Sequence, residues 1–290
     1  MKNPLFVGTC TALVTPFLNQ QVNYPMLEML LQRQIDAGID AVVICGTTGE
    51  APTLTDAEKL ELFSRAKTFA GSSCKVIAGT GSNSTVHTIE LSKAAVQCGV
   101  DGLLIVSPYY NKATQEGLKA HYITIAENAE IPIILYNVPS RTGLDIPVAV
   151  YKELCDIKNI AGIKEASTDI CKTTRILRTC GNNLTVWSGN DDMTVPMMSL
   201  GAKGVISVLS NVAPLQTQAM TQAALAGDFD TAAAIQIELQ PLIELLFCEV
   251  NPVPVKEAMK IIGYDCGQCR LPLSPMDETK RRRLEKALLT

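Results

Sequence analysis

Eight short apolar segments recur along this 290-residue chain, and segments with helical periodicity separate them. Most are rich in valine and isoleucine and do not alternate, which is typical of parallel strands covered on both faces. Eight such strands close a barrel, and no Gly-x-Gly-x-x-Gly fingerprint of an open doubly wound sheet follows the first one. The sequence therefore predicts an α/β fold, a (β/α)8 TIM barrel. The expected strands are Phe6–Val14, Ala41–Cys45, Lys75–Gly79, Gly102–Ser107, Pro132–Asn137, Ile160–Glu165, Leu184–Ser188 and Lys203–Val208.

The strand pattern stops after Gly227, and only helical patterns follow it. Within the barrel region, Thr55 and Glu58 form the pattern of a capping box at the start of a helix over Asp56–Phe69. We expect a catalytic barrel over residues 1–226 and a C-terminal three-helix extension over residues 227–290. The helices of that extension are expected at Phe229–Phe247, Pro254–Ile262 and Pro275–Leu289.

Charge and hydropathy exclude several classes of partner. The chain has 25 basic and 29 acidic residues and a net charge of −4, so it lacks the basic surface that binds nucleic acid. No apolar run approaches the roughly 20 residues that span a bilayer, and no apolar signal segment follows Met1. We therefore expect a cytoplasmic protein with no membrane partner.

Cysteine and histidine give a weak metal signal. The ten cysteines fall inside periodic segments, where thiols of a reducing compartment act as small buried hydrophobic groups. Cys266 and Cys269 form one Cys-x-x-Cys pair without a second pair or a nearby histidine, and His87 and His121 lie in separate helical segments. We expect no metal and no cofactor.

Lys164 lies near the end of the sixth predicted strand, at the end of the barrel where active sites of this fold lie. One interpretation is a lysine that extends to solvent or pairs with Glu165. The other is an amine desolvated by apolar walls, which attacks a carbonyl and forms a Schiff base.

The second predicted strand ends in Gly46–Glu50, where Thr47 and Thr48 lie between glycines. Backbone N–H groups and hydroxyls of such a turn can hold a carboxylate, although ordinary strand-to-helix turns use the same residues. The seventh strand ends near Asp191 and Asp192, which can ligate a metal but have a sufficient structural role at a helix start.

Three of the seven tyrosines follow the fourth and fifth predicted strands, at positions 109, 110 and 136. Tyr136 and Tyr110 near a threonine hydroxyl can form a proton relay, whereas Tyr109 is equally suited to packing. Arg141 presents a bidentate fork for a second carboxylate.

Together these motifs resemble the dihydrodipicolinate synthase family, a branch of the class I pyruvate-dependent aldolases. The likeness extends over essentially the whole chain, including Asn251–Lys256 and Arg270–Leu273. The motifs that carry it, in chain order, are Gly46–Glu50, Pro108–Asn111, Tyr136–Gly143, Gly162–Glu165 and Ser188–Asp191.

The resemblance implies that a lysine Schiff base joins pyruvate to L-aspartate-4-semialdehyde, on the route to lysine and diaminopimelate. It also implies a homotetramer, a dimer of dimers, in which Tyr110 reaches across from the neighbouring subunit. The implied catalytic residues are Lys164, Tyr136, Thr47 and Tyr110, and the implied substrate-binding residues are Thr48, Arg141, Gly189 and Ile206.

One stretch departs from the lysine-inhibited members of that family. They bind the effector with polar and histidine side chains after the Thr-Thr-Gly-Glu motif and with a carboxylate in the next helix. This chain has Ala51, Asp56 and Lys59 in the first stretch and His87 in place of the carboxylate. Because His87 removes a partner for a lysine ammonium, we expect weak or absent feedback inhibition.

Three other functions compete with this interpretation. N-acetylneuraminate lyase and 2-keto-3-deoxy-sugar-acid aldolases share the barrel, tyrosine and lysine, but Arg141 favours a short aldehyde that bears a carboxylate. A non-catalytic homologue would have lost Lys164 or Tyr136, and both are present. A phosphate-binding barrel usually has a glycine-rich loop after strand seven or eight, whereas Ser207–Asn211 contains no glycine.

Overall fold

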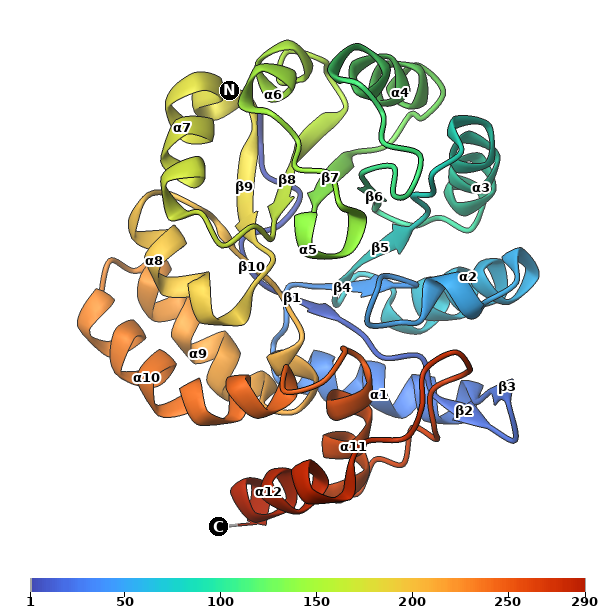
Figure 1. Cartoon of the computed structure of the whole chain (residues 1–290), viewed down its shortest axis with the longest axis vertical. Coiled ribbons are helices and arrows are strands. Elements are labelled where there is room, and N and C mark those ends of the chain that lie inside the picture. The colour runs from blue at the N-terminus through green and yellow to red at the C-terminus, as the bar shows by residue number, and fades with distance from the viewer. Residues whose placement is uncertain (1, 290) are drawn as a thin grey trace.

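The computed structural model describes residues 2–289 and contains a closed barrel of eight parallel strands (Figure 1). Around the barrel the strands follow the order β1-β10-β9-β8-β7-β6-β5-β4, and β4 pairs again with β1. The predicted TIM barrel is confirmed, and each expected strand lies in it with ends that differ by at most two residues. The barrel strands are β1 (Gly8–Ala12), β4 (Ala41–Ile44), β5 (Lys75–Gly79), β6 (Gly102–Val106), β7 (Ile133–Asn137), β8 (Ile160–Glu165), β9 (Thr185–Ser188) and β10 (Gly204–Ser207).

Helices surround the barrel, and a separate hairpin of β2 (Phe17–Leu18) and β3 (Gln21–Val22) lies outside it. The capping box predicted for α2 is present, because the Glu58 N–H donates to Thr55 Oγ1 at 3.2 Å and the Thr55 N–H donates to Glu58 Oε2 at 2.9 Å. The helices between strands are α1 (Tyr24–Asp36), α2 (Asp56–Ala70), α3 (Thr85–Gln97), α4 (Gln115–Glu127), α5 (Pro139–Thr142), α6 (Val148–Leu154), α7 (Ile170–Cys180) and α8 (Thr194–Ser199); α9 (Pro214–Leu225) follows β10.

Three more helices follow α9, namely α10 (Phe229–Leu246), α11 (Val253–Ile261) and α12 (Glu278–Leu289). The last begins at Glu278 and not at the predicted Pro275, because the Asp277 carboxylate accepts from the N–H groups of Thr279 and Lys280 and so caps the first turn. α10 packs against α8 and α9, and α12 packs against α10 and α11. A boundary between barrel and extension at residue 226 stays a prediction.

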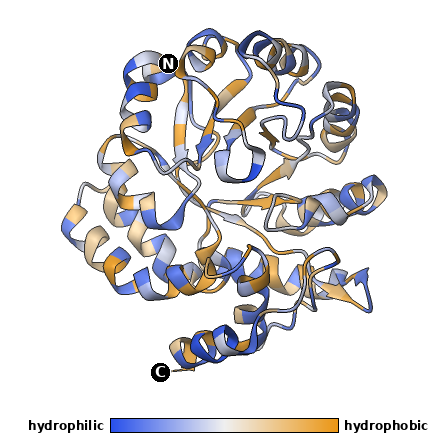
Figure 2. Ribbon diagram, viewed as in Figure 1, coloured by the Kyte–Doolittle hydropathy of each residue, from blue (hydrophilic) through white to orange (hydrophobic). Residues whose placement is uncertain are grey.

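Strand alternation divides the apolar core into two layers. Figure 2 shows that hydrophobic residues recur along the barrel strands. On β7, for example, Ile133 and Leu135 face the surrounding helices, whereas Ile134 and Tyr136 face the inside of the barrel. The inner layer also contains Trp187, against which the Phe6 ring stacks with 4.7 Å between centroids. The same alternation decides which polar side chains at the strand ends reach the interior. No helix within residues 2–289 is long and apolar enough to cross a membrane.

Candidate active site

Lys164 and Tyr136 are paired neighbours on β8 and β7, and both side chains lie on the inner face of the barrel. Lys164 is 5% exposed, and its Nζ lies 4.5 Å from the centroid of the Tyr136 ring. Glu165 extends to the opposite face, so the interpretation of an outward lysine paired with Glu165 is wrong.

The Lys164 amine has no hydrogen-bond or ion-pair partner among residues 2–289. Buried lysines elsewhere in the chain are paired, as Lys172 and Lys256 show with Glu165 and Glu50. A buried primary amine against an aromatic face, with no side chain hydrogen-bonded to it, is suited to act as a nucleophile toward a carbonyl.

In the turn after β4, Gly46–Glu50, which we call the threonine turn, several backbone N–H groups donate to carbonyls of the same turn. The N–H groups of Gly49 and Ala51 donate to the Gly46 carbonyl at 3.1 and 3.3 Å, and that of Glu50 donates to the Thr47 carbonyl at 3.1 Å. The predicted run of converging N–H groups is therefore reduced to those of Thr47 and Thr48, which have no acceptor among the described residues. These two N–H groups and the Thr47 hydroxyl remain available for an anion.

Thr48 lies behind the turn with its side chain buried, and its Oγ1 accepts from Asn251 Nδ2 at 3.0 Å. The Asn251 carbonyl in turn accepts from Arg141 Nη2 at 3.2 Å. One residue near the start of α11 thus connects the threonine turn to the arginine, although they lie far apart in the sequence.

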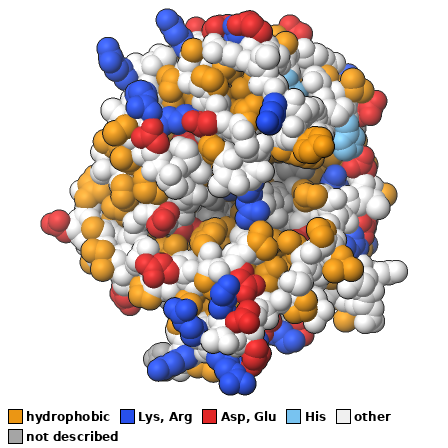
Figure 3. Space-filling view, in the orientation of Figure 1, with side chains coloured by type: hydrophobic (Ala, Val, Ile, Leu, Met, Phe, Trp, Pro, Cys, Tyr) orange, Lys and Arg blue, Asp and Glu red, His pale blue; other side chains and the backbone are white. Residues whose placement is uncertain are grey.

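A cavity of about 830 Å³ opens beside this cluster. Thr47, Tyr109, Tyr136 and the exposed Arg141 line it, and it continues along α2 and α3 as far as His87. The space-filling view shows this side of the molecule hollowed near the centre, with hydrophobic and basic side chains around the hollow (Figure 3). Thr47 and Tyr136 of the predicted proton relay therefore share one cavity with Arg141, the predicted second anion site.

Five other predicted residues do not line this cavity. Lys164 is one of them, although its Nζ lies 4.5 Å from the centroid of the Tyr136 ring, which does line it. Thr48 lies behind the turn, and Ile206 on β10 is fully buried in the inner apolar layer. Gly189 follows β9, where a Cβ would lie 3.1 Å from Lys164 Cγ. Tyr110 is 90% exposed and has a φ of 73°, so its own chain does not bring it to the site.

Asp56, Lys59 and His87, at the positions compared above with the effector site of lysine-inhibited relatives, form a polar cluster at the far end of the cavity. His87 Nε2 lies 2.8 Å from Asp56 Oδ2, and Lys59 Nζ lies 3.1 Å from Asp56 Oδ1. The hydrogen bond from His87, followed by the contact with Lys59, lowers the pKa of Asp56. The one carboxylate at this place already has two cationic or hydrogen-bonding partners.

The chain was compared with known proteins. The model of the dihydrodipicolinate synthetase family matches residues 5–290. The chain therefore belongs to the dihydrodipicolinate synthetase family.

Its relatives cover almost the full length of the chain. A 4-hydroxy-tetrahydrodipicolinate synthase of Acetivibrio thermocellus is 46% identical over 288 residues, which are 99% of this chain and 98% of the relative. The crystal structure of dihydrodipicolinate synthase from Aquifex aeolicus has a TM-score of 0.96 at 43% identity and covers 98% of this chain and 97% of its own. A structure described as the first monomeric dihydrodipicolinate synthase variant has a TM-score of 0.95 at 40% identity, with 98% of both chains covered.

Sequence reasoning missed two buried polar groups of this family member. Glu50, held at a φ of 56°, accepts from Lys256 Nζ at 2.8 Å and from the Arg270 N–H at 2.8 Å, which joins the threonine turn to the C-terminal helices. A lysine inside the apolar run of α11 was the available signal. The second group surrounds Glu165 and is described below.

Asp191 has a structural role, but not that of a cap for its own helix. Its Oδ2 accepts from the N–H groups of Val208 and Leu209, both at 3.0 Å, and so holds the turn after β10. Burial is the main cause that raises the pKa of Asp191. Burial likewise raises the pKa of Cys266 and of Cys269 to about 12, which keeps both as thiols at neutral pH. Among the described residues no group of three or more potential ligands is placed to hold a metal.

Proposed function

We propose that this chain is a 4-hydroxy-tetrahydrodipicolinate synthase that condenses pyruvate with L-aspartate-4-semialdehyde, the first committed step toward lysine and diaminopimelate. The observation that carries the proposal is the unpaired, buried amine of Lys164 on the ring of Tyr136, in a member of this family. The same amine is the group that class I aldolase chemistry requires.

The first step joins pyruvate to the enzyme. The Lys164 amine attacks the C2 carbonyl of pyruvate as the nucleophile, and loss of one water leaves an imine. The free N–H groups of Thr47 and Thr48, with the Thr47 hydroxyl, hold the pyruvate carboxylate. Tyr136, against the amine, supplies the proton that the departing oxygen needs and later takes one back.

The second step forms the carbon–carbon bond. Loss of a proton from the pyruvate methyl group gives an enamine, whose carbon attacks the aldehyde of the semialdehyde and turns it into a hydroxyl. Arg141 at the cavity holds the carboxylate of this second substrate. The substrate amine then attacks the imine carbon, closes the ring and releases Lys164, so the balance is one water lost per product.

Tyr110 enters the relay from a second subunit in this proposal. Its 90% exposure and positive φ present the ring to the outside of its own chain, where a partner subunit can receive it. We therefore propose a homotetramer built from tight dimers. Sedimentation should show the tetramer at assay concentration, and a fully active monomer would contradict both the assembly and this role of Tyr110.

The proposed compartment is the cytoplasm. All ten cysteines are free thiols, most of them buried, which fits a reducing environment. Expression in cells followed by fractionation should recover the activity with cytoplasmic markers, and recovery with another compartment would contradict the assignment.

Borohydride trapping tests the proposed chemistry. The protein is reduced with pyruvate present, and intact mass and peptide mapping should place a pyruvate-derived adduct on Lys164. Lys164→Arg should abolish both the adduct and the turnover of the semialdehyde, whereas Lys203→Arg, a change at the opposite end of the barrel strands, should leave both intact. A label on another residue, or turnover by Lys164→Arg, would refute the proposal.

A further inference from the structure

Directly after the paired Tyr136 and Lys164, the next pair along the same two strands is Asn137 and Glu165. Strand alternation turns this second pair outward, away from the barrel interior and toward the helices. Both side chains are completely or almost completely buried there. Polar groups buried so close to a reactive lysine need partners, and those partners show what the pair does.

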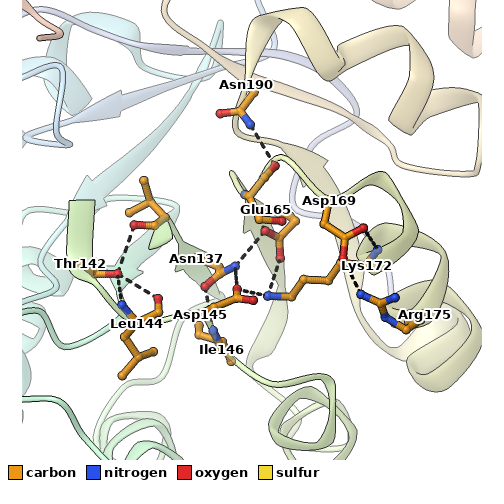
Figure 4. A network of polar contacts seen from close by, with 12 residues as sticks. Asn137, Thr142, Leu144, Asp145, Ile146, Glu165, Asp169, Lys172, Arg175 and Asn190 are labelled. Atoms are coloured by element: carbon orange, nitrogen blue, oxygen red, sulfur yellow. Dashed lines mark hydrogen bonds and ion pairs between the residues drawn. The ribbon is translucent and has the colours of Figure 1, made fainter. Parts of the chain in front are cut away.

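Asn137 uses its whole side-chain amide to hold one loop (Figure 4). Nδ2 donates to Glu165 Oε1 and to Asp145 Oδ1, both at 2.8 Å, and Oδ1 accepts from the Ile146 N–H at 2.9 Å. The backbone of Asn137 also contributes, because its carbonyl accepts from the Ala166 N–H at 2.9 Å. The strand end, the neighbouring strand and residues 145–146 thus meet at one side chain.

Lys172 brings a charge to the same place from α7. It is 3% exposed, contacts Asp145 Oδ1 and lies 3.7 Å from Glu165 Oε2. Glu165 Oε1 also accepts from the Ser167 N–H at 2.8 Å. We call Asn137, Asp145, Glu165 and Lys172 the outer network, in which one buried cation is shared by two carboxylates.

The outer network holds both ends of the segment that carries Arg141. That segment leaves β7 at Asn137, forms the single turn of α5, and returns to the Asn137 amide at Asp145 and Ile146. Inside it, Thr142 Oγ1 binds the Val138 carbonyl at 3.1 Å and accepts from the Leu144 N–H at 3.2 Å. The segment is therefore tied at its base and braced internally.

The Arg141 side chain has one hydrogen bond to the residues that the structure describes, to the Asn251 carbonyl, and is otherwise exposed at the cavity. A long, exposed side chain with one contact takes its position mainly from the backbone that carries it. The base of that backbone segment is held by the outer network.

We propose that the outer network positions Arg141 for the carboxylate of the second substrate, so that Asp145, Glu165 and Lys172 act on specificity without touching substrate. The inference rests on the proposed function. The inference assigns the two substrates to different faces of the strands. Tyr136 and Lys164 lie on the inner face and act on pyruvate, whereas the outer network affects binding of the semialdehyde through the loop that carries Arg141.

Asp145→Asn is the decisive variant. The Asp145 side chain is 55% exposed, so the change leaves no buried charge unpaired on it, and Glu165 remains to balance Lys172. The KM for the semialdehyde should rise about three- to tenfold, since one charged contact of the loop is weakened. The KM for pyruvate and the rate of borohydride trapping should stay within twofold of wild type.

Arg175→Ala is the matched control, because it removes an exposed ion pair of the same helix, to Asp169 at 2.6 Å, that does not reach the loop. Lys172→Arg, which keeps the charge, should also keep the KM for the semialdehyde nearer to wild type than Lys172→Met does. Thermal unfolding of each variant checks that the protein is folded.

A double-variant cycle tests whether the effect passes through Arg141. In an Arg141→Ala background, Asp145→Asn should raise the KM for the semialdehyde no further, and an equal further rise would contradict the inference. An unchanged KM in Asp145→Asn, or equal rises in both KM values, would contradict it too. If wild type traps pyruvate but does not turn over the semialdehyde, the proposed function fails, and this inference fails with it.

Discussion

Gly189→Ala should displace Lys164 from its position beside Tyr136, and it does so by adding a single methyl group. Gly189 follows β9, and its N–H donates to the Glu165 carbonyl at 2.7 Å, so the two strand ends are already in close contact. An added Cβ would lie 2.6 Å from Ala166 Cβ and 3.1 Å from Lys164 Cγ. Carbon atoms in contact are ordinarily about 3.5–4.0 Å apart, so the two strand ends must separate by about 1 Å.

The expected magnitude follows from that displacement. Overpacking of this kind costs about 1–3 kcal/mol in the free energy of unfolding. Misplacement of a reacting group by about 1 Å can cost up to about a hundredfold in rate, so imine formation with pyruvate should slow about 10- to 100-fold. The KM for the semialdehyde should change less, because Arg141 lies on another loop.

The assay is single-turnover trapping, in which pyruvate is mixed with enzyme, quenched with borohydride at increasing times and analysed by intact mass. Urea unfolding gives the stability of the same protein. Gly117→Ala on α4 is the matched control, since its Cβ would meet Thr114 Oγ1 at 3.4 Å, an ordinary contact, and should leave trapping unchanged. Wild-type trapping by Gly189→Ala would refute the reasoning that Gly189 exists to seat Lys164.

Four further predictions follow from the same contacts. Arg141→Ala should raise the KM for the semialdehyde at least tenfold more than the KM for pyruvate, because it removes a bidentate carboxylate contact worth about 1.5–3 kcal/mol. Steady-state kinetics measure both constants, and equal rises would weaken the substrate assignment. Lysine at sub-millimolar concentration should leave the rate of the coupled assay almost unchanged, because Asp56 is occupied by His87 and Lys59; full inhibition would contradict this. Burial lowers the pKa of His121 to about 4, from 6.5, so the unfolded chain takes up a proton first as the pH falls. The contribution of His121 to the free energy of unfolding is therefore complete above about pH 6.5 and falls by about 2 kcal/mol by pH 5. Urea unfolding at pH 5 and at pH 7.5 should show a smaller pH dependence of this free energy in His121→Gln than in wild type. An equal pH dependence in the two proteins would contradict the sign of the effect. Lys256→Met should lower the free energy of unfolding by about 3–5 kcal/mol, because it leaves Glu50 buried without its cation. The double variant with Glu50→Gln should recover part of this loss. A small loss in Lys256→Met alone would show that the pair is not buried in solution.

Much of this molecule could be inferred from runs of neighbouring residues. The apolar strand segments, the capping box of Thr55 and Glu58, and the position of Lys164 at a strand end depend on contacts within a few residues along the chain. Strand number then limits the fold, since eight covered parallel strands have few ways to pack. Family motifs at the strand ends added the chemistry.

Other features depend on residues that are distant in the sequence. The final helix begins where Asp277 caps it. In the turn after β4, three backbone N–H groups donate to carbonyls of the same turn. Lys164 faces inward and Glu165 outward because the barrel closes in one register, and a shift of one residue would exchange them.

The outer network joins Asn137 to Lys172, and the buried pair joins Glu50 to Lys256, across tens to hundreds of residues. Short-range patterns settled which segments are strands and helices and which strand ends carry polar groups, because those patterns are local. Only the closed barrel decided which polar groups are buried together, because a buried charge must find its partner in space, wherever that partner lies in the chain.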